Sequence, residues 1–196
     1  QLGMKFSFTV QKKQIGIPDA MNIGSRFIGK DSFVLALADN IFLGKSFKKT
    51  LSSIQKLKSG AALVSVKTNN PSKSAVIETD RNGAIKSIVE KPKKPKSKNT
   101  IPGLYFYDKE SVRYAKKLKP SKRGELEIVD IHQRYLKENK LKVFPLKNDV
   151  KWFDSGDAEE MLAASNFISK SQNQSKKLIG SIELIALENK WISKKQ

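Results

Sequence analysis

Two aspartates at the ends of short apolar runs are the strongest candidates for chemistry in this sequence. Asp39 follows residues 33–38, and Asp154 follows residues 150–153. A carboxylate at the carboxyl end of a buried strand lies where open α/β sheets bind ligands, and two carboxylates can hold one divalent cation over a phosphate. The pair therefore predicts phosphate chemistry, provided that the two strands are neighbours. Alternatively, each aspartate only caps a turn, a position that Asp favours for local hydrogen bonding.

A second polar pair, Glu90 and Lys91, ends the second strand of a predicted hairpin. A lysine can neutralise a phosphate as a point charge, and a glutamate can accept hydrogen bonds from sugar hydroxyls. The alternative is a solvated strand end, because Glu and Lys are common at surfaces. Residues 123–131 join a glycine turn to an acidic helix start, for which the structural interpretation is favoured.

The composition excludes several kinds of active site. The chain has 196 residues, 38% of them hydrophobic, which fits one domain with a real core. It has no cysteine and one histidine, His132, so disulfides, thiolate zinc sites, thiol nucleophiles and His-rich metal sites are excluded. His132 falls inside a predicted helix and is interpreted as a packing or surface residue. Oxygen-ligated cations such as Mg²⁺ remain possible.

The formal charge of +19 raises the question of nucleic-acid binding. The lysines are spread along the chain, arginines are few, and the aromatic residues lie inside strand-like runs. These features favour a solvated surface over a nucleic-acid interface. No apolar stretch approaches the roughly 20 residues of a membrane span, and no signal-peptide pattern opens the chain, so a cytoplasmic protein without nucleic-acid or membrane partners is expected.

Hydrophobic periodicity predicts alternating helices and strands. Apolar residues alternate from Leu2 to Val10 as in a strand, and Asn82-Gly83 joins two strands in a hairpin over 76–89. Further strands are predicted at 33–38, 61–66, 102–107 and 141–146, with an extended loop at 91–99. Helices are predicted at 18–27, 46–57, 110–118, 127–138 and 157–168, the last capped by Asp157, with a loop at 169–177 and a final helix from Ser181.

Six segments together resemble, in order, the bacterial glucose-1-phosphate thymidylyltransferase family. They are LADNIF at 37–42, EKP at 90–92, GLYFYD at 103–108, KPSKRGELEI at 119–128, WFDSG at 152–156 and ASNFI at 164–168. The resemblance covers nearly the whole chain. It implies a Rossmann-like, three-layer α/β sandwich of the nucleotide-diphospho-sugar transferase kind, with a mixed, mostly parallel sheet. We expect a nucleotidyltransferase domain over 1–170 and a small helical extension over 171–196.

The resemblance also implies a reaction in which glucose 1-phosphate attacks the α-phosphorus of dTTP, giving dTDP-glucose and pyrophosphate. Such transfers depend on positioning and charge neutralisation, and need no covalent nucleophile. By matching position, Asp39 and Asp154 would hold Mg²⁺, Lys91 would contact the sugar phosphate and Glu90 the glucose hydroxyls. The remaining implied substrate-binding residues are Gln11, Gly16, Ile17, Asn40, Ala75 and Ile101. The family implies a homotetramer.

The sequence departs from the family pattern in several places. It contains no Gly-Gly-x-Gly-Thr-Arg-Leu phosphate loop and no downstream phosphate-binding lysine, so the first β-α-β region is expected to be missing and the chain alone inactive. Ala38 and Ala75 stand where the family has glycine, and Pro18-Asp19 replaces an Ala-Gln pair near the base. Two alternatives stay open: a sugar 1-phosphate nucleotidyltransferase that uses UTP or CTP, and a non-catalytic copy or basic binding module.

Overall fold

The computed structural model describes residues 5–193, which form two compact units. The larger unit is residues 9–154, and the smaller unit contains residues 155–193 with residues 5–8. The predicted strand from Leu2 to Val10 falls partly outside the described residues. Residues 5–10 are in no strand, so this prediction is wrong for them. A strand requires a hydrogen-bonded neighbour, and the alternating pattern alone does not supply one.

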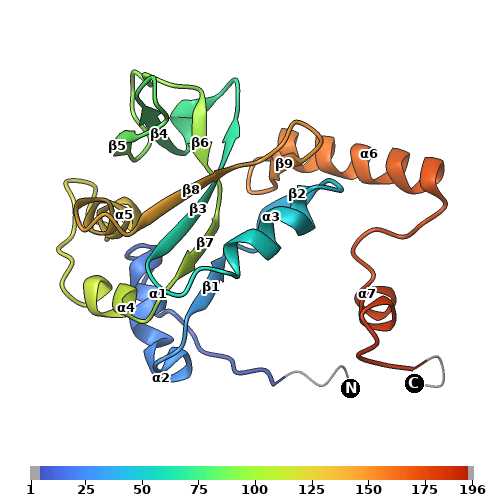
Figure 1. Ribbon diagram of the computed structural model, residues 1–196, viewed down its shortest axis with the longest axis horizontal. Helices are drawn as coiled ribbons and strands as arrows, with labels where there is room; N and C mark the ends of the chain where they lie inside the picture. The colour runs from blue at the N-terminus through green and yellow to red at the C-terminus, as the bar shows by residue number, and fades with distance from the viewer. Residues whose placement is uncertain (1–4, 194–196) are drawn as a thin grey trace. The chain divides into compact units, whose positions relative to one another are not determined.

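A seven-stranded sheet forms the centre of the larger unit (Figure 1). Its strands follow the order β1-β7-β3-β6-β4-β5, and β8 pairs with β3. Their bounds are β1 Phe33–Ala36, β3 Ala61–Lys67, β4 Ala75–Thr79, β5 Ile85–Val89, β6 Asn99–Ile101, β7 Leu104–Tyr107 and β8 Leu141–Pro145. A separate two-stranded ribbon pairs β2, Asn40–Leu43, with β9, Lys151–Asp154.

The α/β class and the mixed sheet are confirmed, but the expected predominance of parallel strands is wrong. Among the described strand pairs only β3–β8 is parallel, while β7 lies between β1 and β3 and pairs antiparallel with both. Apolar runs show that a strand is buried and say nothing of its direction. The predicted strand over 33–38 is also less covered than expected, because Val34 is 54% exposed.

Helices cover both faces of the sheet, which gives the expected three layers. Residues Ala61 and Leu63 of β3 belong to one core, and Ala62 and Val64 belong to the other, as the alternation of a strand requires. The first core is closed by α1 (Ile17–Ile23), α4 (Glu110–Ala115) and α5 (Ile128–Lys137), and the second by α3 (Phe47–Ile54). Two short elements, α2 (Ser25–Ile28) and the 3₁₀ turn Pro71–Lys73, complete this unit.

The hairpin predicted at Asn82-Gly83 is confirmed, with a longer connection than a two-residue turn. Asp80 donates its N–H to Ala84 O at 2.8 Å, and its carboxylate accepts from Asn82 N and Ala84 N. Of the turn residues only Gly83 has a positive φ, 84°, which glycine adopts without steric cost. A type I′ turn needs two such residues, so the chain forms a wider loop.

The smaller unit contains α6 (Ala158–Ser175) and α7 (Ile182–Glu188). Asp157 caps α6 as predicted, because its carboxylate accepts from Glu159 N and Glu160 N. The loop predicted from residue 169 is wrong, since α6 continues to Ser175 through polar residues that a helix tolerates. The expected domain boundary at 170/171 stays a prediction and falls inside α6. No helix within residues 5–193 is both long and apolar enough to cross a membrane.

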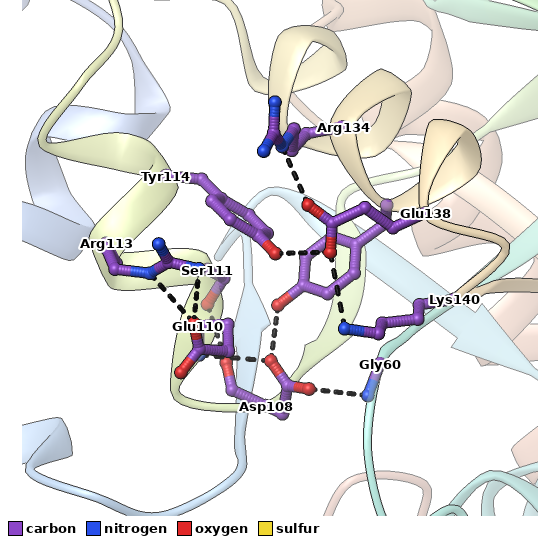
Figure 2. A network of polar contacts seen from close by, with 10 residues as sticks. Gly60, Asp108, Glu110, Ser111, Arg113, Tyr114, Arg134, Glu138 and Lys140 are labelled. Carbon is purple, nitrogen blue, oxygen red and sulfur yellow. Dashed lines mark hydrogen bonds and ion pairs between the residues drawn. The ribbon is translucent and has the colours of Figure 1, made fainter.

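A network of hydrogen bonds around Asp108 connects β3, β7, α4 and α5 (Figure 2). The Asp108 carboxylate accepts from Gly60 N at 2.6 Å, Glu110 N at 3.0 Å and Tyr135 Oη at 2.5 Å. Glu138 accepts from Tyr114 Oη at 2.8 Å and pairs with Arg134 at 2.8 Å. Asp108 follows the last residue of β7, whereas Asp39 lies near its first residue. The network therefore lies at the opposite end of β7 from Asp39.

Candidate functional site

Asp39 lies in the turn that connects β1 to β2. Leu37 donates its N–H to Gly103 O at 2.8 Å, which extends the β1–β7 ladder by one pair. Asn40 donates its N–H to Leu37 O at 3.2 Å and closes the turn. The carboxylate is therefore presented at the end of a strand, as the sequence predicted.

The β2–β9 ribbon brings the second aspartate to the same place. In its antiparallel register, Asn40 is the cross-strand partner of Asp154, so Asp39 precedes that partner directly. Residues opposite each other in such a ladder have Cα atoms about 4.5–5.5 Å apart. The requirement set by the sequence, that the segments carrying Asp39 and Asp154 be neighbours, is met.

The Asn40 side chain ties three segments to this point. Its Oδ1 accepts from Gly103 N at 2.9 Å and from Trp152 Nε1 at 2.7 Å. Its Nδ2 donates to Asp39 Oδ1 at 2.7 Å. Asn40 thus links β7, β9 and the carboxylate of Asp39.

Gly103 permits this arrangement because nothing larger fits there. A Cβ on Gly103 would lie 2.7 Å from the Leu37 side chain and 2.8 Å from Asn40 Nδ2. Sequence reasoning assigned no role to Gly103 or Trp152. The indole N–H of a partly buried tryptophan needs an acceptor, which is the signal that could have pointed to Trp152.

The opposite end of the ribbon is also fastened. The Asp149 carboxylate accepts from Ser46 N at 2.9 Å and from Ser46 Oγ. These hydrogen bonds from Ser46 lower the pKa of Asp149. A Cβ on Gly44 would lie 2.6 Å from Asp149 O, so the two strands approach too closely there for a larger residue. The ribbon is therefore held at both ends and presents Asp39 and Asp154 from a fixed base.

The donor set at Asp39 and Asp154 suits a magnesium ion. Mg²⁺ is commonly held by one or two carboxylates, with substrate phosphate oxygens and water in the other positions. Within residues 5–193, no three His, Cys, Asp or Glu side chains gather into a metal cluster. A site at this pair would thus take its remaining ligands from substrate and water.

Glu90 follows β5 in a partly buried position. Burial raises its pKa, nearby Lys91 opposes this rise, and the negative charge of Glu127 adds to it. Lys91 is exposed and has a φ of 39°, which is uncommon for a residue with a side chain. Backbone held in this region occurs preferentially at ligand sites, where the surrounding structure fixes it.

Glu90 shares a pocket of about 360 Å³ with the loop before α5. Arg123 lines it and pairs with Glu127 at 3.7 Å, and Ser121 Oγ donates to Glu127 at 2.7 Å. Gln133 of α5 also lines it and donates to Ile88 O at 3.2 Å. The segment 123–131, interpreted from sequence as structural, therefore also supplies charged groups beside Glu90.

Three of the residues implied by resemblance are brought together on the sheet. Ala75 pairs with Ile101 across β4 and β6, and both are buried. On the other side of β4, Val76 pairs with Val89 of β5. The next position in the same register sets Ala75 opposite Glu90. Ala75 thus lies between Ile101 and Glu90, and its methyl group occupies the position where the family pattern has only a hydrogen.

The loop before α1 holds the remaining implied residues. Gln11 Nε2 donates to Gly16 O at 3.2 Å and to Asp19 Oδ2 at 2.9 Å. Gly16 has a φ of 113°, and a Cβ there would lie 2.2 Å from Leu126 O, so only glycine fits. Ile17, the first residue of α1, packs on the first core. Asp19, one of the departures from the family pattern, therefore orients Gln11.

His132 is a packing residue, one of the two roles expected for it. It is fully buried, its Nε2 lies 2.6 Å from Tyr107 Oη, and burial lowers its pKa to about 3. It is therefore neutral at physiological pH. The structure places it in the first core and outside the Asp39 and Glu90 clusters.

The sequence profile of the family described as Nucleotidyl transferase matches residues 1–171. The chain belongs to this family.

The nucleotidyl transferase relatives include well-matched curated enzymes. Glucose-1-phosphate thymidylyltransferase of Neisseria meningitidis is 41% identical over 191 residues, which are 97% of this chain and 66% of the relative. The enzyme of that name from Mycobacterium tuberculosis H37Rv is 36% identical over 195 residues, covering 100% of this chain and 67% of the relative. The chain thus spans about two thirds of the length of the curated relatives it matches.

Solved structures of this family show the same fold. A Bacillus anthracis structure described as a glucose-1-phosphate thymidylyltransferase in complex with sucrose has a TM-score of 0.75 and 34% identity, covering 84% of this chain and 65% of that one. A UDP-glucose pyrophosphorylase complexed with UDP-glucose has a TM-score of 0.74 and 26% identity, covering 85% and 66%. The Rossmann-like nucleotidyl transferase fold is therefore confirmed.

We predict that Trp152→Phe destabilises the larger unit by about 1 kcal/mol, the usual contribution of one hydrogen bond. The ring is kept, but Asn40 loses the indole donor. Urea unfolding followed by circular dichroism measures the change. Trp191, which is 61% exposed, provides the control, and Trp191→Phe is expected to leave the midpoint unchanged. Equal midpoints for both variants would show that the Trp152–Asn40 bond contributes nothing.

We also predict that Glu90→Gln raises stability at neutral pH. Because burial raises the pKa of Glu90 in the folded state, the folded chain binds more protons there than the unfolded chain. Stability from this group is present at low pH and falls as pH rises through the interval between the two pKa values. Glutamine carries no charge, so its advantage over wild type should be smallest at low pH and should grow as the pH rises through this interval.

Unfolding free energies measured across this range test the effect, with the exposed Glu188→Gln as the baseline for the same substitution. If the gain in unfolding free energy from Glu90→Gln does not change with pH, the pKa of Glu90 is not raised in the folded state.

Proposed function

We propose that this chain forms the sugar and metal side of a glucose-1-phosphate thymidylyltransferase site. The reaction joins dTTP and glucose 1-phosphate into dTDP-glucose and releases pyrophosphate. The β2–β9 register carries the proposal, because it sets Asp39 beside the cross-strand partner of Asp154. The names and identities of the curated relatives support the choice of reaction.

The chemistry requires positioning more than covalent catalysis. A phosphate oxygen of glucose 1-phosphate attacks the α-phosphorus of the nucleotide, and the bond to pyrophosphate breaks. Lys91 neutralises the attacking phosphate, and ionised Glu90 accepts hydrogen bonds from glucose hydroxyls. Asp39 and Asp154 would hold Mg²⁺, which when bound offsets the negative charge of the phosphates.

Base selection is proposed to involve Gln11. Its Nε2 donates within the chain to Gly16 and Asp19, which leaves Oε1 as the group able to accept from a ligand. Thymine and uracil carry an N3–H donor, whereas cytosine has an acceptor at that position. This geometry favours dTTP or UTP over CTP.

A uridylyl activity is the second candidate, because the UDP-glucose pyrophosphorylase neighbour is 26% identical to the chain. Thymidylyl is favoured by the higher identities of the thymidylyltransferases. Competition among dTDP-glucose, UDP-glucose and CDP-glucose for the chain ranks the bases directly. Tightest binding of UDP-glucose would replace the first candidate with the second.

The homotetramer implied by the resemblance remains part of the proposal.

The proposal predicts that the 196-residue chain binds glucose 1-phosphate in the presence of Mg²⁺ and releases no pyrophosphate from dTTP. Its sequence contains no Gly-Gly-x-Gly-Thr-Arg-Leu segment to bind the triphosphate. Lys91→Ala should weaken sugar-phosphate binding about tenfold or more, because a hydrogen bond to a charged group contributes about 1.5–3 kcal/mol. Isothermal titration calorimetry measures the affinity.

Lys93→Ala, in the same exposed loop, is the matched control and should bind like wild type. The site assignment fails if Lys91→Ala and Lys93→Ala bind equally, or if wild type shows no affinity for glucose 1-phosphate. Normal pyrophosphate release by wild type would contradict the expected inactivity.

A further inference from the structure

The turn between β4 and β5 exposes an asparagine that is followed by glycine. Of the asparagines in the sequence, only Asn82 precedes a glycine. Asn82 and Gly83 are both exposed. Apart from its chain neighbours, no heavy atom of the described residues lies within 4 Å of the place that a Cβ on Gly83 would take. The peptide group between the two residues is therefore open to solvent on the side where a side chain would stand.

An asparagine in this setting can react with the backbone of the next residue. The nitrogen of Gly83 attacks the side-chain carbon Cγ of Asn82 and closes a five-membered cyclic imide. The bond from Cγ to the side-chain nitrogen breaks, and that nitrogen leaves as ammonia with the proton that Gly83 gives up. Glycine favours this step because it has no Cβ to crowd its nitrogen.

Water completes the change by adding to one of the two carbonyl carbons of the cyclic imide and breaking its bond to the Gly83 nitrogen. Opening at the side-chain carbonyl gives aspartate. Opening at the main-chain carbonyl gives isoaspartate, in which the main chain runs through the former side chain. Overall one water is consumed and one ammonia is released, and no atom is oxidised or reduced.

The hydrogen bonds of the turn restrain the reacting atoms. Gly83 donates its N–H to Asp80 O at 3.1 Å. The Asp80 carboxylate accepts from Asn82 N at 2.8 Å and from Ala84 N at 2.9 Å. A nearby carboxylate disfavours removal of a proton from the Gly83 nitrogen, since the product would be a second negative charge. Reaction therefore requires the turn to open, and exposed loops open at a much lower free energy than the whole fold.

We propose that Asn82 deamidates spontaneously to aspartate and isoaspartate, at a rate that the hydrogen bonds of Asp80 restrain. The reacting groups and their restraints all lie within residues 80–84 of the larger unit. The inference rests on this turn and does not depend on the proposed enzymatic activity.

The products would change the turn more than the strands. A carboxylate at position 82 adds a negative charge close to Asp80, which repels it. Isoaspartate also lengthens the main chain of the turn by one carbon. The β4–β5 ladder shifts its register between Glu78 and Thr79, which separates the turn from the part of the ladder next to Glu90. We therefore expect the modification to loosen the hairpin tip and to leave Glu90 in place.

Peptide mass spectrometry of the folded 196-residue chain, incubated for several weeks in neutral buffer at physiological temperature, tests the proposal. Asn82 should convert to two acidic products of equal mass that separate on chromatography. Asn70 is the internal control, because it is also exposed but precedes Pro71, which has no N–H. Asn82→Gln should stay unmodified, since its longer side chain would have to close a six-membered ring.

The restraint by Asp80 is tested separately. Asp80→Ala should raise the rate in the folded chain about threefold or more, because loss of one hydrogen bond shifts the opening of the turn by about this factor. In guanidinium chloride, which unfolds both chains, wild type and Asp80→Ala should react at one common rate, faster than folded wild type. The comparison of folded with unfolded wild type stays informative even if Asp80→Ala fails to fold.

The proposal is overturned if Asn82 stays unmodified in folded wild type, or if Asn70 is modified as fast. It is also overturned if folded wild type reacts as fast as the unfolded chain, or if folded Asp80→Ala reacts no faster than folded wild type.

Discussion

The candidate site depends on the hydrogen bonds of one side chain, that of Asn40. Its amide accepts from the backbone of Gly103 and the indole of Trp152, and donates to Asp39. The first bond joins it to the central sheet, and the second joins it to the strand that ends in Asp154. These bonds add to the Leu37 N–H to Gly103 O bond in holding the ribbon against the sheet. A network of hydrogen bonds around one amide favours a single arrangement of the segments that it joins.

Packing makes that arrangement rigid. Phe42 of the ribbon stacks on Phe47 of α3 with ring centroids 5.0 Å apart, and both pack on the second core. The Ser46–Asp149 bonds close the far end of the ribbon. Glu90 is placed independently by the β4–β5 ladder, and burial of its carboxylate raises its pKa. The two clusters therefore reach their positions through separate elements of one sheet.

Much of this was predictable from residue types and periodicity. The strand-end positions of Asp39 and Asp154, the Asn82-Gly83 hairpin and the Asp157 cap follow from local chemistry, which acts over a few residues. The meeting of the two aspartates depends on the pairing of β2 with β9. The direction of the strands could not be predicted from residue types. It depends on the chain path, in which β6 and β7 follow each other closely and both pair antiparallel with their neighbours. The extension of α6 through residues 169–175 was missed because polar residues are compatible with both helix and loop. The role of Asn40 depends on Gly103 and Trp152, which are remote in sequence and meet only in the fold.

Binding of Mn²⁺ in place of Mg²⁺, followed by electron paramagnetic resonance in the presence of glucose 1-phosphate, tests the central claim most directly. The account predicts one bound Mn²⁺ per chain in wild type. It predicts loss of that ion in Asp39→Asn and in Asp154→Asn, and retention in Asp80→Asn, whose carboxylate accepts hydrogen bonds within the hairpin turn. An ion retained when both Asp39 and Asp154 are replaced, or no bound ion in wild type, would contradict it.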